Sequence, residues 1–193
     1  MIPVVTVEEM RAIDAASRDS EDVLIARAGW AVARAAKQML GGTYGRNVCV
    51  VAGKGNNGND GRYAAAVLKR AGAHVDLVAV GDVLPSCRYD LVIDAAFGTG
   101  FRGDYNAPAT GAPILAVDIP SGVFGDTGRA VSGAVRATKT VTFAAYKPGL
   151  LFHEGRELSG SIDLVDIGLD VSSAKMHIIE SSDVRSRTAT ETH

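Results

Sequence analysis

The most distinctive polar segment of the chain is GKGNNGNDG, which runs from Gly53 to Gly61 between a predicted strand and a predicted helix. Its Gly53, Gly55 and Gly58 satisfy the pattern G-x-G-x-x-G, in which backbone amides approach an anion at a helix N-terminus. The glycine pattern alone is weak, because a tight turn between a strand and a helix would also produce it. The asparagines and Asp60 add polar groups that a turn does not need, so the segment favours a binding role.

Two further carboxylates lie inside apolar runs. Asp94 belongs to LVIDAAFGTGFRGD, and Asp118 belongs to ILAVDIPSG, which also contains Ser121. Because an unpaired buried carboxylate is costly, each should meet a cation, backbone amides, a substrate hydroxyl or a loop that it caps. These segments lack His and Cys, so their Asp, Asn and Ser oxygens suit a hard cation better than a transition metal. Lys147, in KPG, could bring an ammonium to the same place or lie solvated in a turn.

The elements that must position these residues are short apolar runs rich in β-branched residues. Six of them predict strands: VCVVAG, HVDLVAVG, LVIDAAFG, ILAVDIP, KTVTFAA and IDLVDIG. Several are apolar on consecutive positions, which is typical of parallel strands covered on both faces. The sequence therefore predicts an α/β fold with a doubly wound, mostly parallel sheet and helices on both faces. Ligands of such sheets bind outside the carboxyl ends of the strands, so the polar segments should converge on one cleft.

Two helices are predicted before the first of these strands. Thr6 and Glu9 form a capping box for the first helix, and Ser20 can cap a second helix that ends at Gly41. A third helix is predicted over 61–71. The connections between LVAV and LVID and between AAFG and ILAV look too short for full helical crossovers.

Length and charge limit the function classes. The 193 residues suit a single domain, 1–193, whose polar tail from 172 to 193 is expected to fray. A formal net charge of −2 excludes a general affinity for nucleic acid or an anionic membrane. Cys49 and Cys87 are far apart, so they indicate reduced thiols, with Cys49 buried in a strand. Neither a signal peptide nor a long apolar stretch is present, so a cytoplasmic enzyme is expected.

Several ordered motifs resemble the NAD(P)H-hydrate epimerase family. GKGNNGNDG is similar to the family's GPGNNGGDG, DAAFGTGFRGD to its DALFGTGL, and VDIPSG with the following DTG to its DIPSGLDADTG. The resemblance extends from MRAID and RAG through FAAYKPGL to VDIGL, over roughly residues 5 to 170. It implies a Rossmann-like homodimer that interconverts the epimers of hydrated NADH or NADPH at C6 and binds a potassium ion.

The resemblance also implies site residues by position. Those that match the potassium ligands are Asn57, Asp94 and Ser121. Those that match the substrate-contacting segments are Asn56, Asn57, Gly58, Asn59, Asp60, Gly98, Thr99, Gly100, Phe101, Arg102, Gly103, Asp104 and Asp118. Inversion at C6 needs an acid and a base; Asp118 is the first candidate for that work and Lys147 the second.

Two positions depart from the family's pattern. Asn59 stands where the family has Gly, which would matter if φ were positive there, and Ser17 stands where it has a substrate-contacting tyrosine. The ending ESSDVRSRTATETH resembles the junction to the ADP- or ATP-dependent dehydratase domain of larger members, which predicts a fused or separate dehydratase partner. Two alternatives remain: a noncatalytic module that binds a nucleotide or a protein, and an NAD-dependent dehydrogenase whose ribose would be held by Asp82.

Overall fold

A computed structural model describes residues 1–85 and 88–179. Along the chain, its strands and helices are β1 (Ile2–Val4), α1 (Val7–Ala15), α2 (Glu21–Leu40), β2 (Asn47–Ala52), α3 (Asn56–Arg70), β3 (His74–Ala79), β4 (Leu91–Ala95), β5 (Ile114–Val117), β6 (Lys139–Phe143), α4 (His153–Leu158), β7 (Ser161–Val165) and β8 (Met176–Ile178). A short 3-10 helix, η1 (Pro148–Leu150), precedes α4.

The predicted parallel sheet is confirmed. Strands β2 to β7 form one six-stranded sheet in the order β3-β2-β4-β5-β6-β7, and every neighbouring pair in it is parallel. The chain crosses from β2 to β3 on one side and returns to β4 on the other side of β2. Such a reversal between neighbouring strands is the point at which ligands bind in open α/β sheets.

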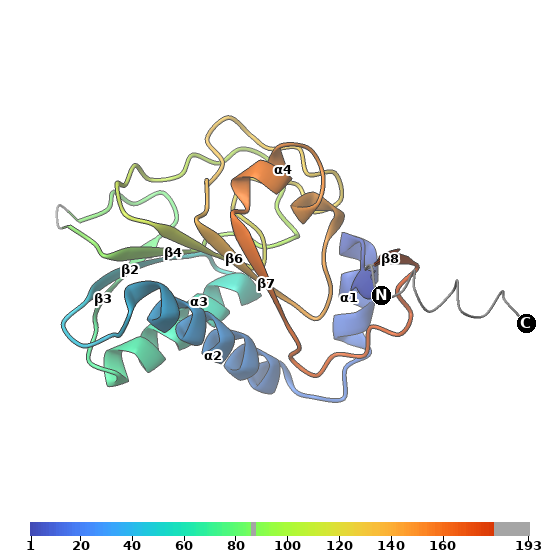
Figure 1. Cartoon of the computed structure of the whole chain (residues 1–193), viewed down its shortest axis with the longest axis horizontal. Coiled ribbons are helices and arrows are strands. Elements are labelled where there is room, and N and C mark those ends of the chain that lie inside the picture. The colour runs from blue at the N-terminus through green and yellow to red at the C-terminus, as the bar shows by residue number, and fades with distance from the viewer. Residues whose placement is uncertain (86–87, 180–193) are drawn as a thin grey trace, which may run out of the picture.

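The two faces of the sheet are covered differently. Figure 1 shows α2 and α3 side by side on one face, whereas α4 and long connections lie over the other face. Alternate side chains of the central strands belong to separate apolar clusters. Val50 and Ile93 pack with the helices on one face, and Val51 and Val92 pack with the connections on the other. Consecutive apolar positions in these strands thus reflect burial on both faces. The short connections are also confirmed, since no described residue between β3 and β5 is helical.

The helix boundaries confirm most of the predicted signals and correct one of them. Thr6 accepts from the Glu9 backbone and Glu9 accepts from the Thr6 backbone, so the capping box of α1 is complete. Helix α2 ends at Gly41, whose φ of 64° is left-handed. Helix α3 begins at Asn56 rather than at Gly61, so most of the polar GKGNNGNDG segment is helical.

The chain ends that the structure describes also differ from the prediction. Strand β1 precedes α1 and pairs with β8 in a separate antiparallel sheet, Ile2 opposite Ile178. The expectation that the chain frays from residue 172 onward is therefore wrong for β8, whose backbone is held by this pairing. Cys49 is fully buried, as predicted, whereas Cys87 lies outside the described residues. No described helix is long and apolar enough to cross a membrane.

Candidate active site

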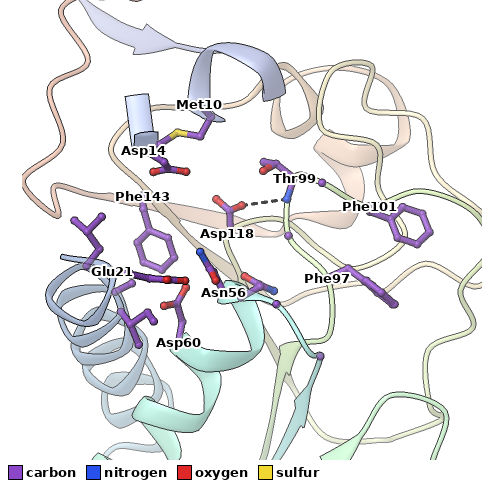
Figure 2. A pocket seen from close by; sticks show the side chains of 18 of the residues that line it. Met10, Asp14, Glu21, Asn56, Asp60, Phe97, Thr99, Phe101, Asp118 and Phe143 are labelled. Atoms are coloured by element: carbon purple, nitrogen blue, oxygen red, sulfur yellow. Dashed lines mark hydrogen bonds between the residues drawn. The ribbon is translucent and has the colours of Figure 1, made fainter. Parts of the chain in front are cut away.

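A cleft of about 1190 Å³ opens at the carboxyl ends of β2, β4 and β5. Figure 2 shows Met10 and Asp14 of α1 on one side of it and Asp60 of α3 on another, with Asp118 and Thr99 between the walls. The cleft thus lies at the reversal of the strand order, where the sequence predicted that the polar segments meet. Its volume is at the upper end of those of small-molecule sites, which suits a ligand as large as a dinucleotide.

A buried ion pair lies at the floor of the cleft. The Lys147 side chain is 1% exposed, and its Nζ donates to Asp118 Oδ1 at 2.6 Å. The same ammonium donates to Thr142 Oγ1 at 2.9 Å and to the Phe143 carbonyl at 3.0 Å. Its hydrogen-bonding capacity of three donors is therefore filled, which is the condition for burying a lysine. Lys147 is fixed next to Asp118, as one of the two readings of KPG predicted.

The backbone turns sharply at Asp118 to present its carboxylate to the cleft. Its φ is 67°, a left-handed value that is uncommon outside glycine but less so for Asp. The second carboxylate oxygen, Oδ2, accepts from the Thr99 backbone at 3.2 Å. Residues held in sparsely populated backbone conformations cluster at functional sites, because the surrounding structure must maintain them. The geometry therefore agrees with the prediction that Asp118 is a candidate site residue.

Asp94 is held by neutral donors. Its Oδ1 accepts from Ser121 Oγ at 2.7 Å, and its Oδ2 accepts from the Ser121 backbone at 2.8 Å. The Ser121 hydroxyl in turn accepts from the Phe97 backbone at 2.9 Å. Burial raises the pKa of Asp94 to about 6, although these hydrogen bonds oppose the shift. The group joins β4 to the corner after β5 and leaves the carboxylate without an opposite charge in the described contacts.

Asn57 carries unsatisfied polar atoms. Its side-chain oxygen and nitrogen are both buried, and neither has a hydrogen-bond partner among the described residues. The side chain lies against Gly98, where an added Cβ would be 3.5 Å from the Asn57 Cβ and 3.2 Å from Asp118 Oδ2. Gly98 directly follows Phe97, whose backbone donates to Ser121. The three predicted metal ligands, Asn57, Asp94 and Ser121, therefore lie around the segment that contains Phe97 and Gly98. A buried amide is expected to have a hydrogen-bond partner, which here would be a water, a ligand or an ion.

Asp60 and Asp14 make this end of the cleft acidic. Asp60 is 8% exposed, and burial raises its pKa to about 8, with further increases from the charges of Asp118 and Asp14. Burial and the charge of Asp118 also raise the pKa of Asp14, against the opposing charge of Lys147. Asp60 is therefore mostly protonated at neutral pH and can donate a hydrogen bond into the cleft.

The raised pKa of Asp60 predicts a pH dependence of stability. A carboxyl group that binds its proton more tightly in the folded protein than in the unfolded chain stabilises the fold at low pH. This contribution is lost as pH rises from about 4 to about 8. We expect the free energy of unfolding of Asp60→Asn to exceed that of wild type by several kcal/mol at pH 9. The difference should be smaller at pH 5. Urea denaturation across this range measures both.

A matched control for Asp60→Asn is Asp163→Asn, which removes a half-exposed carboxylate paired with Lys139 at 2.8 Å. Its stability curve should run parallel to that of wild type. Parallel curves for Asp60→Asn and wild type between pH 7 and 9 would contradict the assignment, since Asp94 is already ionised there.

The structure brings most of the predicted substrate-contacting residues to the cleft. Those that line it are Asn56, Asn57, Asp60, Gly98, Thr99, Gly100, Phe101 and Asp118, together with Lys147. Those that do not are Gly58, Asn59, Arg102, Gly103 and Asp104. Asn59 is helical with φ outside the positive range, so the anticipated backbone restriction there does not arise. Ser17, in place of the family's tyrosine, forms a local turn with Asp19.

Sequence reasoning missed the wall that α1 contributes. Met10, Arg11 and Asp14 line the cleft, and α1 is docked there partly by Val7, whose backbone donates to Asp126 Oδ1 at 2.7 Å. This contact joins residues far apart in sequence, so no local pattern indicates it. The one available signal was Asp14 itself, an acidic residue next to the buried Ile13 on an amphipathic helix. Within residues 1–85 and 88–179, no cluster of three or more His, Cys, Asp or Glu side chains could hold a metal ion.

Comparison with known proteins identifies relatives of this arrangement. The family described as "YjeF-related protein N-terminus" matches residues 21–84 and 79–149. The NAD(P)H-hydrate epimerase of Weissella koreensis is 37% identical over 67% of this chain and 74% of its own length. The bifunctional NAD(P)H-hydrate repair enzyme Nnr of Thermofilum pendens is 34% identical over 82% of this chain. The chain spans only 39% of that longer relative.

A solved structure agrees with the fold. The crystal structure of yeast ynu0, YNL200c, superposes with a TM-score of 0.67 over 93% of this chain and 97% of that one. Its 19% sequence identity limits the comparison to the fold.

Proposed function

Because the chain belongs to the family of YjeF-related protein N-termini, we propose that it epimerises hydrated NADH and NADPH at C6. The observation that carries the proposal is the buried Lys147–Asp118 pair facing a large cleft at the reversal of the strand order. The family relationship supplies the substrate class, and the pair supplies groups able to act on a proton within that cleft.

The chemistry follows from the position of the hydroxyl, which is attached to a carbon next to the ring nitrogen. The nitrogen lone pair can expel it, so that the C–O bond breaks and a C=N bond forms; water then adds to the opposite face. The departing hydroxide needs a proton, and the incoming water must lose one, which keeps the protons in balance. Asp118 is the group we assign to these transfers. Lys147 fixes its orientation and balances its charge through the 2.6 Å contact.

We propose that the same site also binds a potassium ion. The side chains that would hold it are Asn57, Asp94 and Ser121, whose oxygen donors suit a hard monovalent cation. The fit rests on the unpartnered Asn57 amide and on the buried Asp94, which has only neutral donors in its described contacts. Such an ion would supply the missing positive charge next to Asp94 and hold the start of α3 to the corner after β5.

Potassium should therefore raise the melting temperature of the protein relative to a large organic cation such as tetramethylammonium. An ion that binds only the folded state, at about a hundred times its dissociation constant, raises the midpoint by roughly 5–10 °C in a domain of this size. Asn57→Ala should remove this increment, because it deletes a donor. Asn59→Ala is the control: Asn59 is on the same turn of α3 but contacts Arg62. Equal melting of wild type in both salts would refute the ion site.

The direct test of the proposed function is to separate the R and S hydrates of NADH by chromatography after incubation with the protein. We expect equilibration of the epimers well above the spontaneous rate, which is subtracted from a protein-free sample. Loss of the hydrates without interconversion would contradict the proposal. Titration with ordinary NAD, and with NAD plus an alcohol substrate, tests the binding-module and dehydrogenase alternatives in the same preparation.

The proposal includes three further properties, of which the bifunctional relatives support only the dehydratase. They are a homodimer, a cytoplasmic location and a dehydratase, fused or separate, that consumes one epimer. Since the chain spans about two-fifths of the bifunctional relatives, it would correspond to their epimerase portion. Size-exclusion chromatography with light scattering measures whether the dimer forms.

A further inference from the structure

The cleft has opposite charges at its two ends. Acidic side chains predominate at the end formed by α1, α2 and the start of α3, namely Asp14, Glu21, Asp60 and Asp118, although Arg11 of α1 also lines the cleft. Lys54 and Arg62 line it near β2 and β3, together with Ala79 and Val80. Both of these cations are exposed, unlike Lys147, which is buried in its ion pair. The basic end is therefore available to an anionic part of a ligand.

The register of the sheet places this basic end. Ala52 of β2 is opposite Ala79 of β3, so the residues that follow each strand, Lys54 and Val80 among them, lie at the same edge of the sheet. Arg62 reaches this edge from α3, since its Nη2 donates to the Gly53 carbonyl at 2.7 Å. Its Nη1 donates to Asn59 Oδ1 at 3.2 Å, which fixes the guanidinium from the second side.

This contact gives a role to a residue that departs from the family's motif. Asn59 stands where the motif has Gly, and a glycine offers no side chain to orient Arg62. The guanidinium has five N–H donors, of which two are engaged in these contacts. The remaining three donors make no hydrogen bond that the structure describes, and the exposed guanidinium suits bidentate recognition of a phosphate.

In dinucleotide-binding α/β sheets, the strand end next to the glycine-rich turn receives the adenosine ribose. An acidic residue there accepts from the ribose 2′-hydroxyl, whereas an arginine accommodates a 2′-phosphate. Asp82 is the acidic residue that follows β3, but it is exposed and does not line the cleft. The groups present at this end are thus cationic.

We propose that Arg62 and Lys54 form a subsite for the 2′-phosphate of the adenosine half, so that the chain prefers hydrated NADPH to hydrated NADH. This inference rests on the proposed function for the identity of the dinucleotide. It adds a subsite distant from Asp118 and explains why the cleft continues past α3 to the end of β3.

The test uses two fragments that lack the nicotinamide, 2′-phospho-ADP-ribose and ADP-ribose, titrated calorimetrically into the whole protein. Wild type should bind the phosphorylated fragment about tenfold more tightly. The double variant Arg62→Gln/Lys54→Met should bind the two fragments with equal affinity. Asn59→Gly should lower the ratio to an intermediate value, because Arg62 loses its second contact.

The matched control is Arg70→Gln/Lys69→Met, which removes the same charges from the exposed last turn of α3 and should keep the wild-type ratio. Equal binding of the two fragments by wild type would overturn the inference, as would a ratio that survives the double variant. These outcomes are separable from the proposed function, since fragment binding needs no turnover. Epimerisation of both hydrates without fragment selectivity would leave that function standing and remove the subsite.

Discussion

Asp118→Asn should lower the rate of epimerisation by about a hundredfold or more, the loss expected when a positioned acid/base group is removed. An amide of the same shape has one accepting oxygen, so it can keep either the contact with the Thr99 backbone or the contact with Lys147, but not both. It cannot take a proton from water at the reacting carbon. The decrease should therefore appear in kcat, whereas KM for the hydrate should change little. Initial rates of R-to-S conversion, corrected for the spontaneous reaction, measure it.

The Asp118→Asn substitution is also expected to lower the stability of the protein. Asp118→Asn leaves the buried ammonium of Lys147 without its counter-charge, which costs about 3 kcal/mol when one partner of a buried pair is removed. The double variant Asp118→Asn/Lys147→Met removes both charges and should recover most of that loss. It should nevertheless remain inactive, which separates the chemical role of the Asp118–Lys147 pair from its contribution to stability.

The surface pair provides the matched control for this comparison. Lys139 and Asp163 are 2.8 Å apart and partly exposed, so neutralising both should leave the rate within about twofold of wild type. A well-folded Asp118→Asn/Lys147→Met protein that epimerises at the wild-type rate would remove Asp118 from the mechanism. The reaction would then have to use another group of the cleft.

The sheet could be predicted from the sequence because each of its strands carries its own signal. Val48 to Ala52 and Leu91 to Ala95 are almost uniformly apolar, and burial on both faces of a parallel strand produces that pattern. Strands β1 and β8 carry no such signal, since each has three residues and the pairing joins opposite ends of the described chain. Contacts between short segments that are far apart in the sequence form only in the folded protein, so no local sequence pattern indicates them.

The candidate site could be predicted to a similar extent. The contacts of Asp94 with Ser121 and of Asp118 with Lys147 follow the rule that the carboxyl ends of parallel strands meet at one edge. The left-handed backbone of Asp118 could not be anticipated, because the DIPSG segment permits several turn geometries. Arg62 was missed because it lies in the helix beyond the glycine-rich segment, and only the start of α3 at Asn56 aims it back at Gly53.

That start explains why local propensity misplaced the helix. Asparagine and glycine are poor helix formers, so the pattern favours a loop up to Gly61. In the structure, Gly58 allows the first turn of α3 to lie directly on the end of β2. An added Cβ at Gly58 would be 2.0 Å from the Gly53 carbonyl oxygen and 2.9 Å from its nitrogen. Close packing against backbone therefore outweighs the propensity of these residues.

Gly58→Ala should accordingly be among the most damaging single substitutions in the chain. Alanine favours a helix by about 1 kcal/mol over glycine, so propensity alone predicts a more stable protein. The contact with the Gly53 backbone predicts the opposite, because α3 must move away from β2 at a cost of about 3 kcal/mol or more. The same movement displaces Asn57 and Asp60 from the cleft, so we expect epimerisation to fall by more than about a hundredfold.

Gly55→Ala is the matched control, since Gly55 caps the same helix and an added Cβ there meets nothing within 4 Å. Its φ of −89° is accessible to alanine, so the stability of this variant should stay close to that of wild type. Urea denaturation measures the free energy of unfolding of both variants, and the epimer assay measures their rates. If Gly58→Ala were as stable and as active as Gly55→Ala, α3 would not rest on β2 as described. The glycine would then serve only to expose backbone to the ligand, and the geometry proposed for the whole cleft would need revision.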